Sequence, residues 1–246
     1  MIDKFSQINY NNNGDNMINN VKKEIDYNEY YLSLDNIPKN DELTRIKEYA
    51  LINKVPIILD DGLKVLLHTV SSDKNINVLE IGTAIGYSAI NMALVNPNLY
   101  IDTIERNELM YNEAINNINR LNLKNRINVI FNDALLVDIS DLNKEYDVIF
   151  IDAAKAQYTK FFNKFEVLLK KGGIVFSDNL KFHGLVGNSK ESLSKNLKNL
   201  VKKIEDYNLF LRENERFLTT FLDIGDGIAI SIKKWEKYEK DYNWLS

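Results

Sequence analysis

The decisive stretch of this sequence reads Val78-Leu79-Glu80-Ile81-Gly82-Thr83-Ala84-Ile85-Gly86-Tyr87-Ser88. Its apolar start predicts a buried strand over residues 76–81, the glycines predict a turn over residues 82–86, and a helix is expected from Tyr87. Strands that pass through a glycine turn into a helix are typical of open α/β sheets, in which ligands bind at the carboxyl ends of the strands. This turn is therefore the first candidate for a binding site.

Short apolar runs alternate with helix-length segments along the rest of the chain. Strands are predicted over residues 76–81, 100–104, 127–131, 146–151 and 173–176, with helices over residues 87–95, 107–122, 158–169 and 191–207. This alternation predicts a parallel sheet with helices on both faces. The Asp-Gly turn in Ile224-Gly225-Asp226-Gly227 separates apolar runs over residues 216–222 and 228–232, which predicts an antiparallel hairpin at the sheet edge. The expected fold class is α/β and Rossmann-like, with a mostly parallel seven-stranded sheet.

The N-terminal part of the chain is expected to be helical after a frayed start. The first twenty residues are polar and rich in asparagine, which predicts an extension over residues 1–20 and a single domain over residues 21–246. A first helix is predicted between Val21 and Pro38, a second from Asp41 to about Asn53 with Asn40 or Asp41 as its cap, and a third from Leu59 or Asp60 to Val70.

Composition excludes several classes of protein. The 246 residues contain no cysteine, which excludes disulfides, a thiol nucleophile, thiolate-bound zinc and iron–sulfur clusters. No apolar run is long enough to span a membrane and no signal sequence is recognisable, so we expect a cytoplasmic protein without a membrane partner. The net charge is −4, so any contact with nucleic acid would need a local basic patch.

The glycine turn does not fit a dinucleotide. That fingerprint needs glycine at positions 82, 84 and 87, and this chain has only Gly82. The spacing suits a ligand without a pyrophosphate, because Gly82 allows close approach of the backbone, Ser88 can bind a carboxylate and Glu80 can meet an ammonium group. These are the demands of an amino acid tail joined to a nucleoside.

Two further acidic residues end the next strands. Glu105 can accept hydrogen bonds from both ribose hydroxyls, and Asp133, in Asn132-Asp133-Ala134, can reach the amino group of an adenine. Each acid alone could be a solvated charge at a strand end. The ordered set of Glu80, Glu105 and Asp133 predicts a site for S-adenosylmethionine.

A second cluster ends the fourth and fifth strands. Adjacent parallel strands lie about 4.8 Å apart, so Asp152, Asp178 and Asn179 can converge on one point. Two carboxylates and an amide suit Mg²⁺ or Ca²⁺. The alternative is that these side chains only cap the strand ends. Beside a cofactor site, we favour the metal.

Four motifs carry a family resemblance in combination. They are E-I-G-T-x-x-G-Y-S from Glu80, I-D-A-A-K from Ile151, S-D-N from Ser177 and I-G-D-G from Ile224. Together they resemble the cation-dependent class I O-methyltransferases of the catechol and caffeoyl-CoA type over about residues 30–234. The resemblance implies a class I methyltransferase fold and a homodimer.

The same resemblance implies roles for individual residues. Asp152, Asp178 and Asn179 would hold Mg²⁺, and the catalytic residues would be Asp152 and Lys155, with Lys155 as general base. The implied cofactor-binding residues are Ile58, Glu80, Gly82, Thr83, Ser88, Glu105, Asp133, Ala134 and Asp152. The alternative for Lys155 is a phosphate contact or a solvated side chain. His68 lies in an apolar helical run, where we expect it to be packed, so it is a poor candidate for the base.

The segments over residues 152–158 and 178–186 most resemble one bacterial branch of this family. That branch methylates 5-hydroxyuridine at the tRNA wobble position, so tRNA is the expected substrate. Two departures from that pattern are Lys181, where an apolar residue is expected, and His183, where arginine is expected.

Lys195, Lys198 and Lys202 share one face of the helix predicted over residues 191–207. This face could bind phosphates or simply be solvated. The alternatives to a tRNA enzyme are an enzyme acting on catechol-like or hydroxycinnamoyl acceptors and a non-catalytic protein that binds S-adenosylmethionine. A nicotinamide oxidoreductase is disfavoured by the glycine spacing.

Overall fold

The computed structural model describes residues 40–72, 74–142, 145–188, 191 and 193–235. The predicted extension over residues 1–20, the first predicted helix and the predicted domain start at residue 21 lie outside these residues. Among the described residues, no helix combines the length and the apolar character that crossing a membrane requires.

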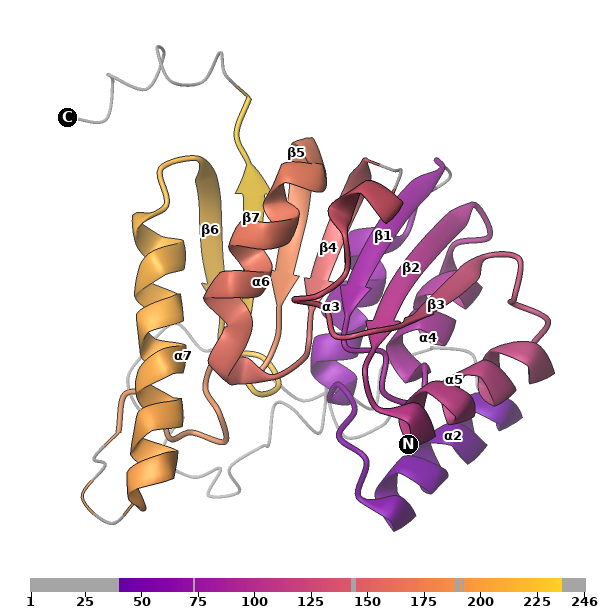
Figure 1. Ribbon diagram of the computed structural model, residues 1–246, viewed down its shortest axis with the longest axis horizontal. Coiled ribbons are helices and arrows are strands. Elements are labelled where there is room, and N and C mark those ends of the chain that lie inside the picture. The colour runs from indigo at the N-terminus through magenta and orange to yellow at the C-terminus, as the bar shows by residue number, and fades with distance from the viewer. Residues whose placement is uncertain (1–39, 73, 143–144, 189–190, 192, 236–246) are drawn as a thin grey trace, which may run out of the picture. The chain divides into compact units, whose positions relative to one another are not determined.

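Seven strands form one sheet in the described part of the chain, in the order β3-β2-β1-β4-β5-β7-β6 (Figure 1). They are β1 (Ile76–Ile81), β2 (Leu99–Glu105), β3 (Ile127–Phe131), β4 (Tyr146–Ile151), β5 (Leu169–Ser177), β6 (Phe217–Leu222) and β7 (Ile228–Lys233). The first five strands pair in parallel, whereas β7 is antiparallel to both β5 and β6. The predicted mixed sheet with an antiparallel C-terminal hairpin is confirmed.

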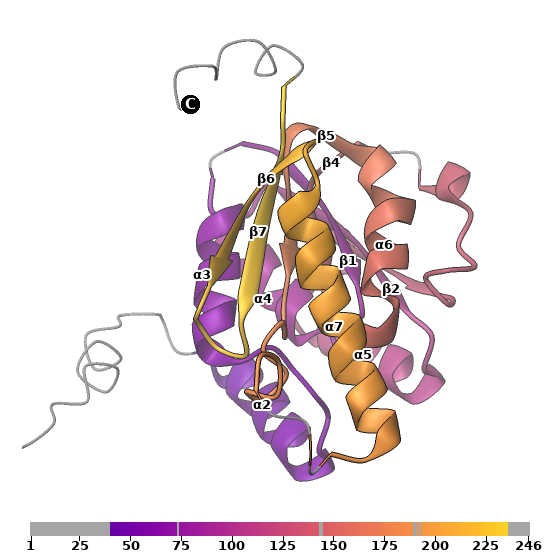
Figure 2. The ribbon, with the colours of Figure 1, turned by 90° about the vertical axis from the view of Figure 1, so that its left-hand side faces the viewer.

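Helices cover both faces of this sheet (Figure 2). They are α2 (Asp41–Asn53), α3 (Asp60–Val70), α4 (Tyr87–Val95), α5 (Glu108–Arg120), α6 (Tyr158–Phe165) and α7 (Lys195–Glu213). Successive strand residues point to opposite faces, so Val78 packs in the core beneath α2 to α5 while Leu79 packs in the core beneath α6 and α7. Both faces of the central strands are thus buried, which explains their continuous apolar runs.

Some boundaries differ from those predicted. Strand β5 begins at Leu169, earlier than the predicted Gly173, because Leu169 already pairs with Tyr146 of β4. The register between the two strands then shifts, so that the next pair is Val148 with Ile174. Helix α7 begins at Lys195, where the Ser194 side chain caps it, and runs on to Glu213. The prediction that His68 is packed is wrong, since its side chain is exposed and its Nδ1 contacts the carbonyl oxygen of Lys64.

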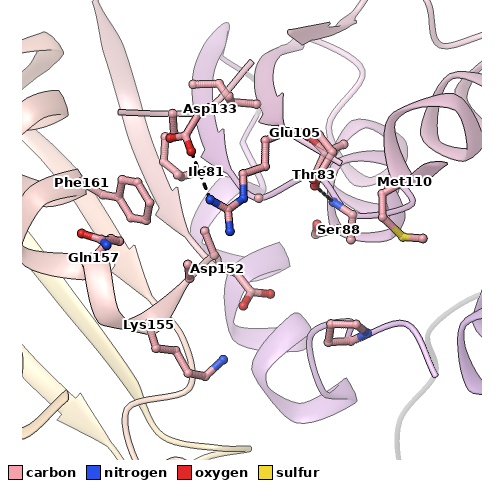
Figure 3. A pocket seen from close by; sticks show the side chains of 18 of the residues that line it. Ile81, Thr83, Ser88, Glu105, Met110, Asp133, Asp152, Lys155, Gln157 and Phe161 are labelled. Carbon is pink, nitrogen blue, oxygen red and sulfur yellow. Dashed lines mark hydrogen bonds and ion pairs between the residues drawn. The ribbon is translucent and has the colours of Figure 1, made fainter. Parts of the chain in front are cut away.

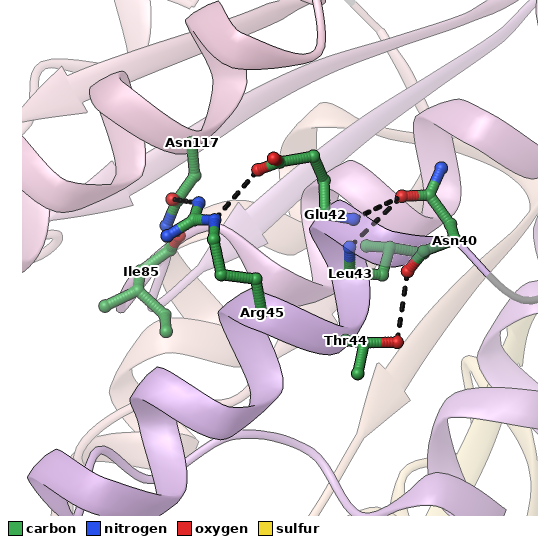
Figure 4. Close-up of polar contacts among 7 residues, drawn as sticks. All are labelled: Asn40, Glu42, Leu43, Thr44, Arg45, Ile85 and Asn117. Atoms are coloured by element: carbon green, nitrogen blue, oxygen red, sulfur yellow. Dashed lines mark hydrogen bonds and ion pairs between the residues drawn. The ribbon is translucent and has the colours of Figure 1, made fainter.

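A polar clasp joins α2 to the glycine turn and to α5 (Figure 4). Asn40 caps α2 as predicted, and Arg45 of that helix donates to the side-chain oxygen of Asn117 over 2.7 Å. Asn117 in turn donates to the carbonyl oxygen of Ile85 over 3.0 Å. The clasp therefore holds the turn that follows β1 at Ile85.

Candidate active site

A cavity of about 340 Å³ lies at the carboxyl ends of the central strands (Figure 3). Most of the predicted site residues line it, namely Ile58, Gly82, Thr83, Ser88, Glu105, Asp133, Ala134, Asp152 and Lys155. The topology explains the convergence, because the carboxyl ends of parallel strands meet at one edge of a sheet. Three predicted residues, Glu80, Asp178 and Asn179, lie outside this lining.

Gly82, directly after β1, packs tightly against the backbone that follows β4. Its φ of +103° is in the region that favours glycine, and a Cβ atom there would lie only 2.1 Å from the carbonyl oxygen of Asp152. No side chain can be accommodated at that distance. The glycine thus allows the turn and the Asp152 segment to share one wall of the cavity.

Glu80 lies beneath the cavity and is fully buried. Its carboxylate accepts hydrogen bonds from the hydroxyls of Ser88 and Thr103, and burial raises its pKa to about 8. Ser88 does line the cavity, so it stands between Glu80 and any ligand. That Glu80 binds an ammonium group stays a prediction, and the contact would run through the Ser88 hydroxyl.

Glu105 and Asp133 stand at the ends of β2 and β3 and are held by backbone amides. The two oxygens of Glu105 accept from the amides of Ala84 and Asn107, over 2.9 and 2.7 Å. Asp133 accepts from the amide of Leu135, and this bond, together with the nearby Arg106, lowers the pKa of Asp133. Both side chains therefore line the cavity in positions that backbone amides fix.

Arg106 was not among the predicted site residues, although it lines the cavity and pairs with Asp133 over 3.1 Å. Its position directly after Glu105 was the available signal. Apolar wall residues were also missed, among them Met110 of α5 and Phe161 of α6. They belong to helices whose inward faces give no sign of a cavity in the sequence.

The structure brings Asp152, Asp178 and Asn179 together. The side-chain nitrogen of Asn179, Nδ2, donates to Asp152 Oδ1 and to Asp178 Oδ2, each over 3.0 Å. Burial, and then the charge of Asp152, raise the pKa of Asp178 to about 7. Burial also raises the pKa of Asp152, which the charge of Lys155 partly offsets.

These residues fit a divalent cation. In the part of the chain that the structure describes, no three His, Cys, Asp or Glu side chains form a metal-binding group, so the candidate ligands are two carboxylates and one amide. Carboxylate and amide oxygens are the ligands that Mg²⁺ and Ca²⁺ prefer, and Asn179 would turn its side-chain oxygen to the cation in place of the nitrogen that now faces both carboxylates. Two neighbouring carboxylates that share one amide group would be stabilised by a cation between them.

Lys155 stands beside this cluster, in the short 3₁₀ turn over Lys155–Gln157 that follows β4. Its side chain is half-buried and lines the cavity, with Nζ 6.0 Å from the centre of the Phe182 ring. Tyr158 fixes the start of α6 against this region by donating to the carbonyl oxygen of Asp178 over 3.1 Å. The charge of Lys155 acts to lower the pKa of both Asp152 and Asp178, so Lys155 remains the predicted general base.

Comparison with known proteins gives one consistent family. The model of a family described as O-methyltransferase matches residues 32–234. A flavonoid 3',5'-methyltransferase from Vitis vinifera is 30% identical over 194 residues, which cover 75% of this chain and 80% of the relative. A caffeoyl-CoA O-methyltransferase from Populus kitakamiensis is 27% identical over 75% of this chain and 80% of its own length.

Solved structures agree with this family. A Staphylococcus aureus protein that carries a provisional caffeoyl-CoA O-methyltransferase name is 38% identical, with a TM-score of 0.79 over 84% of this chain and 99% of that protein. An O-methyltransferase from Bacillus cereus, solved in complex with SAH, is 26% identical, with a TM-score of 0.69 over 85% of this chain and 97% of that protein. The predicted homodimer is not tested by these likenesses and stays a prediction.

Proposed function

Because this chain belongs to the O-methyltransferase family, we propose that it transfers the methyl group of S-adenosylmethionine to a hydroxyl of a small phenolic acceptor, assisted by a divalent cation such as Mg²⁺. One observation carries the proposal. Asp152 lines the cavity and also accepts a hydrogen bond from Asn179, so a single side chain belongs to the cavity and to the oxygen cluster. A cofactor and an acceptor held at these two places would meet at Asp152.

The cavity is the proposed cofactor site. Glu105 faces it with a carboxylate suited to ribose hydroxyls, Asp133 with one suited to an adenine amino group, and Ser88 with a hydroxyl suited to the amino acid tail. The Bacillus cereus relative was solved with SAH, the product that S-adenosylmethionine leaves after methyl transfer. That complex supports the same choice of cofactor here.

The oxygen cluster is the proposed acceptor site. Asp152, Asp178 and Asn179 would hold the cation, whose chemistry is to lower the pKa of a hydroxyl and to orient its oxygen. Lys155 is placed to take the hydroxyl proton, because it lies beside both carboxylates. The acceptor oxygen must come about 3 Å from the methyl group in line with the bond that breaks, and the shared Asp152 fixes that relation.

The names of the relatives support a phenolic acceptor. The curated relatives include enzymes named for caffeoyl-CoA and for flavonoids, at 27% and 30% identity. Phenols with neighbouring hydroxyls suit a cation held by two carboxylates, since both oxygens can approach it.

The second candidate acceptor is 5-hydroxyuridine in tRNA, and a separate observation favours it. Helix α7 extends beyond the carboxyl edge of the sheet, the edge at which the site lies (Figure 1). Lys195 and Lys202 are exposed on this helix, and Lys198 is half-exposed. A basic overhang beside the acceptor site suits phosphates of a large substrate.

Labelled methyl transfer separates these candidates. The protein is incubated with labelled S-adenosylmethionine and with catechol, caffeoyl-CoA or tRNA that carries 5-hydroxyuridine, with EDTA and with restored Mg²⁺. Turnover of a small phenol that EDTA abolishes and Mg²⁺ restores is the expected result. Turnover of tRNA alone, weakened by salt and by changing the three lysines to alanine, would overturn the small-molecule acceptor in favour of RNA. Full activity of verified metal-free protein would overturn the role of the cation.

A further inference from the structure

The turn of the C-terminal hairpin packs against the loop that follows Asn179, over residues 180–187. Leu180 donates its amide to the carbonyl oxygen of Gly227 over 2.9 Å, and Lys181 donates to that of Asp226 over 2.8 Å. Gly227 has a φ of +83°, and a Cβ atom there would lie 2.9 Å from the amide nitrogen of Lys181. The approach therefore requires glycine, and it ties the 180–187 loop to the antiparallel edge of the sheet.

Asp226 adds a side-chain contact to these backbone bonds. It is 7% exposed, and its Oδ1 accepts the amide hydrogen of His183 over 2.5 Å. Its Oδ2 is buried without a hydrogen bond, 3.6 Å from Nδ1 of His183. An aspartate that served only the hairpin turn would be better placed in water, because burying a carboxylate is costly without strong hydrogen bonds.

The contact falls on a strained part of the 180–187 loop. Phe182 and His183 have φ values of 46° and 55°, so two consecutive residues other than glycine adopt the left-handed conformation. Such strain persists only where the surroundings fix it. Asp226 binds the amide of the second of these residues and so helps to hold the step.

The strained step determines where the Phe182 ring lies. The ring is half-buried, and its centre is 6.0 Å from Nζ of Lys155. Lys155 acts electrostatically on Asp152 and Asp178. The Phe182 ring therefore connects the 180–187 loop to the lysine that acts on both carboxylates. Within the described residues, the hydrogen-bond partners of Gly82, Glu105 and Asp133 all lie outside this loop.

We infer that Asp226 is a positioning residue for acceptor binding: it holds the 180–187 loop in the left-handed step that keeps Phe182 over Lys155. Loss of Asp226 then weakens acceptor binding and leaves cofactor binding intact. The kinetic part of this inference rests on the proposed function, whereas the anchoring of the loop does not.

Amide hydrogen exchange tests the anchoring in the full chain without any substrate. In Asp226→Ala the amide of His183 should exchange at least about tenfold faster, because its hydrogen bond is lost. Asp226→Asn keeps an oxygen acceptor and should restore protection. Asp223→Asn is the matched comparison from the same hairpin, because Asp223 is largely exposed and, among the described contacts, pairs with the side chain of Lys181 and not with a loop amide. Exchange at His183 should therefore stay within about twofold in this variant. Unchanged exchange at His183 in Asp226→Ala would overturn the inference.

Steady-state kinetics and SAH titration test the consequence for binding. Asp226→Ala should raise the acceptor KM about tenfold or more, while SAH affinity stays within about twofold, and Asp226→Asn should recover most of the KM. Equal losses of acceptor and SAH binding would indicate a merely structural role and overturn the inference. If Asp226→Ala does not fold, Asp226→Ser, with its shorter acceptor, should show the same changes at smaller size. Failure of the wild type on every acceptor would refute the proposed function and leave the exchange result to decide the anchoring.

Discussion

At the ends of β2 and β3 the acidic side chains are held separately by backbone amides, whereas at the ends of β4 and β5 two acidic side chains share the side-chain amide of one asparagine. Glu105 accepts from the amides of Ala84 and Asn107, and Asp133 accepts from that of Leu135. Asp152 and Asp178 instead both accept from the side chain of Asn179, and Asp178 also accepts the backbone amide of Asn179 over 2.7 Å. The pKa of Asp133 is accordingly lowered by its backbone bond, while burial raises that of Asp178 to about 7.

We call the ends of β2 and β3 the cofactor side and the ends of β4 and β5 the acceptor side. The acids of the cofactor side have their hydrogen-bond partners within the protein, whereas those of the acceptor side would be stabilised further by a bound cation. On the cofactor side, Glu105 and Asp133 already accept hydrogen bonds from neighbouring amides before anything binds, and the pKa of Asp133 is lowered. The charges on the acceptor side repel one another, and a divalent cation would remove that repulsion. Substitutions on each side test this contrast, and the largest effect is expected at Gly82, where the two sides are in contact.

Gly82→Ala should damage both sides at once. The added Cβ would lie 2.1 Å from the carbonyl oxygen of Asp152 and would strain a φ of +103°. We expect the free energy of unfolding to fall by roughly 3 kcal/mol or more, with loss of cofactor binding. Chemical denaturation measures the first effect and SAH titration the second.

Gly184→Ala is the matched control for this substitution. Gly184 also has a positive φ, +76°, but no atom lies within 4 Å of an added Cβ. It should cost only about 1 kcal/mol, from backbone strain alone. Equal costs at the two glycines would contradict the close contact between the ends of β1 and β4.

Asp178→Asn should damage the acceptor side alone. Changing residues that only support metal ligands costs 10- to 100-fold in many sites, so loss of a ligand should lower kcat/KM by at least about 100-fold. SAH affinity should stay within about twofold, because Asp178 does not line the cavity. Kinetics beside titration, with Asp223→Asn as an exposed control, make the comparison. A parallel loss of SAH binding would show that the two sides are not separable.

Glu105→Ala should damage the cofactor side alone. If Glu105 accepts two ribose hydroxyls, the loss of charge-assisted hydrogen bonds worth roughly 1.5–3 kcal/mol each weakens cofactor binding at least tenfold. Calorimetric titration with SAH measures it. Glu108→Ala is the control, since Glu108 is an exposed residue of the first turn of α5. Unchanged affinity in Glu105→Ala would remove this residue from the cofactor site.

Sequence reasoning reached the parts of the site that follow from strand ends. Gly82, Glu105 and Asp133 each end a strand of apolar residues, and parallel pairing then brings them to one edge. Asp152 and Asp178 were expected to converge because β4 and β5 were expected to be neighbours, and the structure pairs those strands. Such inferences need only local pattern and topology.

The remaining parts depend on contacts that no local pattern encodes. Asp226 meets His183 across 43 positions of sequence, through a left-handed step that ordinary side chains rarely adopt. Glu80 lies between the apolar residues Leu79 and Ile81 of β1. Its side chain can be buried because the hydroxyls of Ser88 and Thr103 donate to it, and the sequence does not reveal these partners. Exposure of His68 likewise depends on how α3 is rotated against the sheet.

Glu80→Gln should change how stability depends on pH. The pKa of Glu80 is raised to about 8 by burial, from an ordinary value of 4.5. Between these two values the folded protein keeps a proton that the unfolded chain has released, so stability falls as pH rises and the loss is complete above about pH 8. Glutamine cannot ionise, so the variant should lose less stability across this range, with a difference of about 3 kcal/mol between pH 5 and pH 8.

Added Mg²⁺ distinguishes this effect from that of Asp178, whose pKa is raised to about 7 and whose contribution has the same sign. A cation bound beside Asp178 should restore stability near pH 8 in the wild type and in Glu80→Gln alike, because it acts on the acceptor side. Most of the slope due to Glu80 should persist in its presence, because burial is the largest cause of the raised pKa of Glu80 and the charge of Asp152 is a smaller one. Thermal unfolding at several pH values, with Mg²⁺ or EDTA, measures both. If Mg²⁺ abolished the difference between wild type and Glu80→Gln, the two sides would share one electrostatic site and the contrast drawn between them would be wrong.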